Sequence, residues 1–163
     1  MSTESDIALV TKQELELVLE TFDEAAAFAL GSAIYQRAVK DGLGLVVDIR
    51  TWDRQMFFAA TPGTSSDNAE WVRRKINTVK RFHRASYRMV LERGEVAFTP
   101  QSGCDPADYV IAGGGFPLRV KGAGIIGSVT ISGLPGRVDH GVVVEALCDH
   151  LGVDRALYAL PSE

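Results

Sequence analysis

Hydrophobic residues recur at helical spacing in four stretches of this chain and alternate with polar residues in shorter runs between them. The first helical pattern covers residues 11–22, where Thr11 and Glu14 have the spacing of a capping box. The second follows Asp23, which can cap it, and should end near Gly42. We expect residues 1–10, which precede both, to be frayed.

Two further helical patterns occupy the middle and the end of the chain. A long helix is expected to begin at Ser66 or Asp67 and to run to about Glu92, because its apolar positions recur three and four residues apart. The last helix should open at Val138 or Asp139. Its buried side is predicted to include Val142, Val143 and Leu147.

Five short runs have the composition of β-strands, and turn residues separate most of them. They are residues 45–49, 55–60, 95–98, 116–120 and 125–132. Neighbouring strands are joined by short turns, so the sheet should be mostly antiparallel. With helices at the start, middle and end of the chain, the pattern predicts an α+β domain in which helices pack on the sheet.

Composition narrows the class of protein. The 163 residues suit a single domain, and a net charge of -4 argues against general nucleic-acid binding. The first ten residues lack the pattern of a signal peptide, and no stretch is apolar enough to span a membrane, so we expect a cytoplasmic location. Cys104 and Cys148 are far apart and show no metal spacing, and we expect them to be buried free thiols.

The loop from Ser132 to His140 holds several groups suited to an anion. Its glycines allow backbone N–H groups to approach a ligand, a helix begins there, and Arg137 could bind a carboxylate or phosphate. The alternative is a plain turn in which Asp139 caps the helix, and a capping carboxylate would oppose an anion.

Histidines and a few cations complete the candidate site. His140 and His83 are the first candidates to bind a metal or heme, and each could equally be a packed or surface residue. No pair of residues has a metal-site spacing. Arg119 and Lys121 alternate on one strand and could line a pocket or face solvent. The helix after residue 66 has many arginines and lysines, which suit either an anion surface or a solvated face.

One long segment also resembles a known family. GGGFPLRVKGAGIIGSVTISGLPGRVDHGVVVEAL at Gly113–Leu147 is similar to the GlcG/HbpS-type family, often labelled a heme-degrading domain. Supporting stretches lie at Phe22–Ala38, Leu45–Arg50 and Pro62–Phe82. The resemblance implies a profilin-like fold with a five-stranded antiparallel sheet and helices on both faces. It also implies homo-oligomers, while its members share no single activity.

Three functions follow as hypotheses. The first is a small-molecule binding domain whose lead ligand is heme or another anionic tetrapyrrole. In it, His83 or His140 would contact the metal, and Arg119, Lys121 or Arg137 the carboxylates. The second is an oligomeric scaffold with no chemistry of its own. The third is an enzyme that degrades heme or acts on a small organic acid, although no catalytic arrangement is visible in the sequence.

Overall fold

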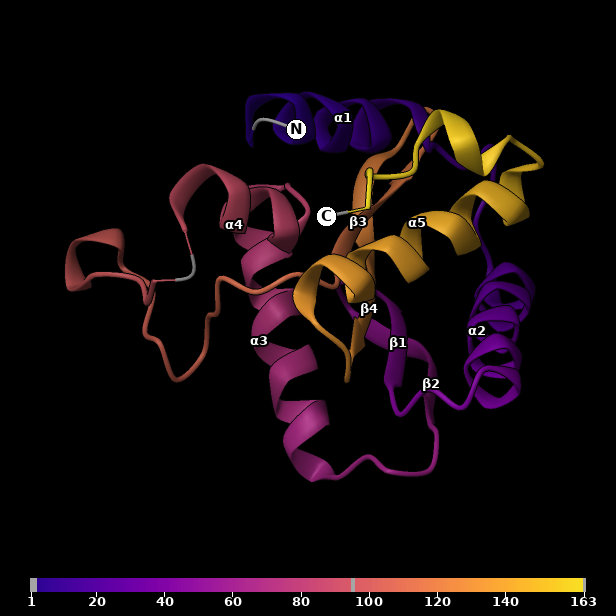
Figure 1. Cartoon of the computed structure of the whole chain (residues 1–163), viewed down its shortest axis with the longest axis horizontal. Helices are drawn as coiled ribbons and strands as arrows, with labels where there is room; N and C mark the ends of the chain where they lie inside the picture. Colours follow the sequence, from indigo (N-terminus) through magenta and orange to yellow (C-terminus); the bar gives the residue numbers. More distant parts are fainter. Residues whose placement is uncertain (1–2, 95, 163) are drawn as a thin grey trace.

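Four antiparallel strands form the centre of the computed structural model, which describes residues 3–94 and 96–162 (Figure 1). The strands are β1 (Val46–Thr51), β2 (Arg54–Ala60), β3 (Gly115–Val120) and β4 (Gly124–Ser132). Their order across the sheet is β2-β1-β4-β3, so β1 and β4 lie in the middle. Each pair of neighbours is antiparallel, as the sequence predicted.

Helices cover both faces of this sheet. They are α1 (Thr3–Glu16), α2 (Glu24–Lys40), α3 (Ser66–Phe82), α4 (Ser86–Arg93) and α5 (Gly136–Leu151), with short 3₁₀ turns η1 (Pro100–Ser102) and η2 (Arg155–Leu157). In β1, Val46 packs with Val72 and Ile76 of α3. The next residue, Val47, points to the opposite face and joins the main core with α2 and α5. The α+β class with helices on both faces is therefore confirmed.

The fifth strand predicted at residues 95–98 is wrong. Val96–Phe98 are not in a strand, and Glu95 lies outside the described residues. Phe98 is buried instead in a separate small cluster with Met89, Cys104 and Ile111. The free edge of β3 is closed by a single bridge, in which Leu19 N–H donates to the Arg119 carbonyl over 2.9 Å and Lys121 N–H donates to the Leu19 carbonyl over 2.9 Å.

The N-terminal helix begins earlier than expected. Residues 3–10 are not frayed but form the first half of α1, where Asp6 and Val10 are buried. Thr11 is inside this helix, and its hydroxyl donates to the Ile7 carbonyl rather than capping a helix start. The α1 helix lies beside α4 (Figure 1), so tertiary contacts stabilise its first turns.

The long helix predicted to reach Glu92 is two helices. His83 adopts a left-handed conformation with φ 53° and ends α3, and α4 starts three residues later. Ser65, one residue before the predicted start, caps α3 together with the Asn68 side chain. Asp23 caps α2 as predicted, by accepting a 2.8 Å hydrogen bond from the Ala26 N–H.

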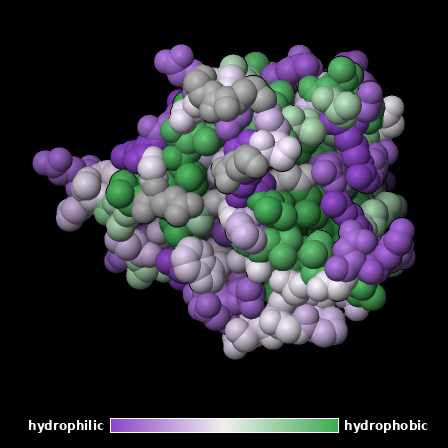
Figure 2. Space-filling view, viewed as in Figure 1, coloured by the Kyte–Doolittle hydropathy of each residue, from purple (hydrophilic) through white to green (hydrophobic). Residues whose placement is uncertain are grey.

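A long connection between α4 and β3 projects from the body of the protein (Figure 1). It returns along α3, where Arg73 donates to Asp108 and Asn77 donates to the Asp108 carbonyl. The same view in Figure 2 shows hydrophobic surface beside α5, bordered by hydrophilic side chains. The projecting connection forms one wall of the cavity described next.

Candidate functional site

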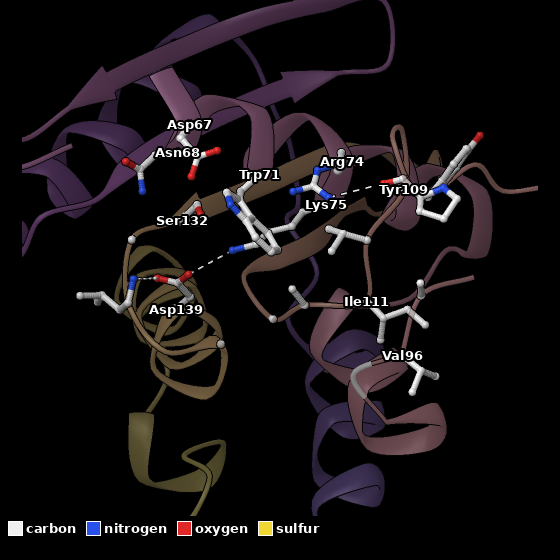
Figure 3. Close-up of a pocket in the computed structure, with 18 residues that line it drawn as sticks. Asp67, Asn68, Trp71, Arg74, Lys75, Val96, Tyr109, Ile111, Ser132 and Asp139 are labelled. Carbon is white, nitrogen blue, oxygen red and sulfur yellow. Dashed lines mark hydrogen bonds and ion pairs between the residues drawn. The ribbon is translucent and has the colours of Figure 1, made fainter. Parts of the chain in front are cut away.

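A cavity of about 510 Å³ lies between the first half of α3, the start of α5 and the returning part of the α4–β3 connection (Figure 3). This volume is in the range usual for small-molecule sites. Its polar lining comes from Asp67, Asn68, Arg74, Lys75, Ser132 and Asp139, and its apolar lining from Trp71, Val96, Tyr109, Ile111 and Leu134. Glycine backbone completes the wall at Gly113, Gly133 and Gly136.

The cavity contains a buried ion pair between α3 and α5. The Nζ of Lys75 lies 3.1 Å from Oδ2 of Asp139 and donates over 2.9 Å to the Ile131 carbonyl at the end of β4. Only 3% of the Lys75 side chain and 1% of the Asp139 side chain are exposed. The pair therefore joins two helices and the central sheet at one point (Figure 3).

Burial acts on both members of this pair. It lowers the pKa of Lys75, and the Asp139 carboxylate opposes this decrease. Burial also raises the pKa of Asp139, while Lys75 and the backbone N–H groups of Leu134 and Gly133 oppose this increase. The Leu134 N–H donates to Oδ1 of Asp139 over 3.0 Å. The lowered pKa of Lys75 and the raised pKa of Asp139 both make it easier for the Lys75 ammonium to release its proton than it is for an exposed lysine.

Asp139 holds the loop before α5 without capping the helix. The helix begins at Gly136 with Pro135 at its N-cap, and no side chain caps it. The Asp139 carboxylate reaches back to the Leu134 N–H and is tied to Lys75. Its charge is thus balanced by a cation, which removes the objection that a capping carboxylate would repel an anion at this loop.

The rim of the cavity carries a guanidinium stacked on an indole. Arg74 lies over the Trp71 ring, with its guanidinium carbon 4.3 Å from the ring centroid. Arg74 also makes a long 3.5 Å hydrogen bond to the Pro106 carbonyl. Arg74 makes no ion pair with any of the described residues, whereas its neighbour Arg73 is paired with Glu70 and Asp108. Arg74 is therefore the cation best placed to meet an anionic ligand.

Close backbone packing sets the shape of the inner wall. A Cβ on Gly113 would lie 2.2 Å from the Gly136 carbonyl oxygen, so only glycine lets this segment pass the start of α5. The next residue, Gly114, has φ 125°, which side chains rarely adopt. The triple glycine read in the sequence as flexible backbone is in fact a tightly packed passage.

Of the six predicted site residues, Asp139 alone is found among those that line this cavity. His140 lies on the buried face of α5 and is fully buried, with its ring near Tyr87 and Phe116. Its Nε2 lies 2.7 Å from Oε1 of Gln13, whose amide nitrogen donates to the Tyr158 carbonyl. Burial, and to a smaller degree Arg137, lowers the pKa of His140 to about 3.

The remaining four residues are dispersed. Arg137 is tied to Asp6 over 2.9 Å and to the Pro161 carbonyl over 2.6 Å, beside a second cavity of about 320 Å³. His83 is exposed at the end of α3. Arg119 donates to the Glu14 carbonyl, and Lys121 is exposed with a 3.5 Å contact to Glu20. Their role in ligand binding stays a prediction, and the fold does not gather them in one place.

Sequence reasoning missed Lys75, Trp71 and Arg74. It grouped Lys75 with the charged positions of a basic helix and treated Trp71 as a packing residue. Two signals pointed the other way. Lys75 lies one helical turn from Trp71 and next to the apolar Ile76, so it falls toward the buried stripe of α3.

The cysteines, possible metal ligands and possible membrane spans were also predicted from the sequence. Cys104 and Cys148 are buried free thiols, as expected. Within residues 3–94 and 96–162, no group of three or more His, Cys, Asp or Glu side chains is arranged to hold a metal ion. In the same described part of the chain, no helix is both long and apolar enough to cross a membrane.

Comparisons with known proteins find relatives and solved structures that are similar to this chain over most of its length. UPF0303 protein mlr5144 of Mesorhizobium japonicum is 57% identical over 165 residues, which cover 100% of this chain and 99% of that protein. The crystal structure of Ybr137w protein superposes with a TM-score of 0.82 at 24% identity, covering 92% of this chain and 94% of the other. A PduOC:heme complex gives a TM-score of 0.64 at 21% identity, with coverage of 85% and 99%.

The family model described as haem degrading protein HbpS-like matches residues 22–148. This range includes β1 to β4, α2 to α4, most of α5 and both residues of the buried ion pair. The solved structures share the fold at low identity, and they say nothing by themselves about the ligand of this chain. The chain belongs to the HbpS-like family.

Proposed function

We propose that this chain is a small-molecule binding domain whose ligand is a small organic acid held in the cavity between α3 and α5. The observation that carries the proposal is that the cavity holds one paired cation, Lys75, and one cation without an ion-pair partner among the described residues, Arg74. Lys75 and Asp139 neutralise each other, which leaves the Arg74 guanidinium as the cation on the rim that a carboxylate can pair with. The exposed Asp67, which also lines the cavity and lies about two turns before Arg74 on α3, suits a donor group of the ligand.

Two helix starts support the choice of an anion. The lining residues Asn68 and Trp71 belong to the first turns of α3, and Gly136 is the first residue of α5. Helix N-termini present unpaired N–H groups and a partial positive charge. The Trp71 ring and the side chains of Tyr109 and Ile111 offer apolar surface to the carbon part of the ligand.

Heme is the ligand implied by the family description, and the cavity can be checked against it. Heme iron in proteins is held mainly by histidine, cysteine or methionine, with tyrosine in some cases. Across the described lining there is no histidine, cysteine or methionine. His140 lies in the core, where its Nε2 contacts Gln13, and His83 lies elsewhere on the surface. A histidine-ligated heme therefore does not fit this cavity.

Calorimetric titration tests the proposal. Lactate and pyruvate should bind saturably, and lactamide, which lacks the carboxylate, should not. Arg74→Gln should weaken binding about tenfold or more, because a hydrogen bond to a charged group is worth roughly 1.5–3 kcal/mol. Arg73→Gln is the matched control, since Arg73 neighbours Arg74 but pairs with Glu70 and Asp108 outside the cavity. Equal affinity of both variants, or binding of lactamide, would sink the proposal.

Association into homo-oligomers is a separate proposal. Phe28 and Phe58 are 66% and 45% exposed, and β2 is an edge strand with an unpaired side. Light scattering during gel filtration should give a mass above the 17.6 kDa of one chain. A monomer at micromolar concentration would contradict it.

A further inference from the structure

The buried lysine of the cavity differs from every other lysine of the chain. The sequence contains five lysines, at positions 12, 40, 75, 80 and 121. Lys75 is 3% exposed, whereas Lys40, Lys80 and Lys121 are exposed and Lys12 is half-buried. A charged amine is costly to bury, so a buried lysine in a ligand cavity is a candidate for chemistry as well as for structure.

The two hydrogen bonds of Nζ can both be kept when the Lys75 ammonium loses one proton. A neutral amine has two N–H bonds and one lone pair. The structure gives Nζ two acceptors, the Ile131 carbonyl at 2.9 Å and Asp139 Oδ2 at 3.1 Å. Nζ makes no third hydrogen bond within residues 3–94 and 96–162, and Lys75 is one of the residues that line the cavity. Burial lowers the pKa of Lys75, which favours the neutral form.

The neighbouring backbone leaves room around this nitrogen. A Cβ at Gly114 would lie 2.9 Å from Nζ, so any larger residue there would crowd the amine. Ser132 and Trp71 lie on the cavity side near the pair (Figure 3). The amine is thus fixed by two hydrogen bonds and faces the space in which the organic acid is proposed to bind.

We propose that Lys75 forms an imine with an aldehyde or keto group of an oxo acid bound in this cavity, with Asp139 as the proton carrier. This inference rests on the proposed function and names the substrate class. Amines of desolvated lysines are suited to this reaction. It needs neither oxidant nor reductant, because the exchange of a C=O for a C=N bond is not a redox step.

The proton balance follows from the 3.1 Å contact. The ammonium of Lys75 gives a proton to the Asp139 carboxylate, and the nitrogen lone pair forms a bond to the carbonyl carbon. One proton moves from nitrogen to the new alkoxide oxygen, which gives a carbinolamine. Its hydroxyl group leaves as water with the proton returned by Asp139. The products are a protonated imine on Lys75, one water molecule and the Asp139 carboxylate, which pairs with the new cation.

Reductive trapping on the wild-type protein tests the inference. The protein is incubated with pyruvate and sodium cyanoborohydride near neutral pH, and peptide mapping measures modification at each of the five lysines. Lys75 should be modified faster than Lys80, because burial lowers the pKa of Lys75 and so favours its neutral, nucleophilic form. Asp139→Asn should slow the reaction at Lys75 and leave Lys80 unchanged. Modification of Lys80 with Lys75 intact would overturn the inference.

Lactate separates this inference from the proposed function. Lactate has the carboxylate of pyruvate but no carbonyl, so it should bind and protect Lys75 from trapping. If lactate and pyruvate bind but Lys75 is not trapped, the imine is wrong and the binding function stands. If neither acid binds and Lys75 is not trapped, both proposals fail. Lys75→Arg, which keeps the charge and cannot form an imine, should lose the labelled peptide while circular dichroism confirms its fold.

Discussion

Replacing Lys75 by methionine should strongly destabilise the protein, because it leaves Asp139 buried without its cation. The carboxylate is 1% exposed, and its described partners are Lys75 and the loop N–H groups near Leu134. Breaking a buried pair by removing one partner typically costs about 3–5 kcal/mol. The loss of the Lys75 bond to the Ile131 carbonyl adds to this cost.

A double variant isolates the charge effect. Lys75→Met with Asp139→Leu removes both ionic groups and replaces them by apolar side chains. It should recover most of the lost stability, since a buried pair replaced by apolar residues is often neutral. Recovery should fall short by about 1–3 kcal/mol, because the Leu134 N–H loses its acceptor.

The pH dependence of the stability loss shows whether the unpaired Asp139 carboxylate causes it. In the Lys75→Met variant nothing opposes the effect of burial, so the pKa of Asp139 rises further above its unfolded value. The folded variant then binds more protons than the unfolded one, and its stability falls as pH rises through that interval. The deficit relative to wild type should therefore be largest at pH 7 and shrink as pH falls.

Urea unfolding followed by circular dichroism measures all three proteins at several pH values. If Lys75→Met stays within about 1 kcal/mol of wild type at pH 7, the pair carries little energy and the reasoning is wrong. A deficit that is constant with pH would show that lost packing, and not an unpaired carboxylate, is the cause.

Three further predictions concern other parts of the structure. Burial lowers the pKa of His140 to about 3, so the protein should lose up to about 1.4 kcal/mol of stability per pH unit as pH falls below about 6.5. In urea unfolding, the stability of His140→Gln should depend less steeply on pH over this range. Gly113→Ala should destabilise the fold by several kcal/mol, because its Cβ would clash with the Gly136 carbonyl. Gly141→Ala should raise the melting temperature slightly, because open space surrounds this position of α5 and alanine favours a helix. Equal melting temperatures of the two variants would contradict this. Finally, hemin absorbance should be the same with wild type and His83→Ala, since His83 is exposed outside the cavity, and a Soret band lost in the variant would argue against that assignment.

Much of the fold could be predicted from periodicity. The alternating runs that became β1 to β4, and the Asp23 cap of α2, follow from local chemistry. The errors came from tertiary effects. The apolar run at 96–98 packs Phe98 into a side cluster rather than a sheet, and His83 breaks a helix whose apolar stripe continues beyond it.

The candidate site was harder to predict, because its residues come from distant segments. Asp139 was expected at the start of α5 and found there, but its partner Lys75 lies 64 residues away. The local pattern places Lys75 near the buried stripe of α3 but does not show which distant carboxylate it meets. His140 illustrates the converse, since its imidazole made it a candidate ligand, while the helix turns it toward Gln13 and the core.

Backbone amide NMR with pyruvate tests the central claim most directly, because it locates binding without assuming which residues are involved. We expect saturable shifts for Asn68, Gly113, Gly133 and the Trp71 indole, which surround the cavity. We expect none for Gly141, which lines the 320 Å³ cavity near Arg137, or for Ala33, which lines a further cavity of about 520 Å³ between α2 and α5. Lactate should shift the same signals. Shifts confined to Gly141 or Ala33, or no shifts at saturating pyruvate, would contradict the assignment of this cavity as the binding site.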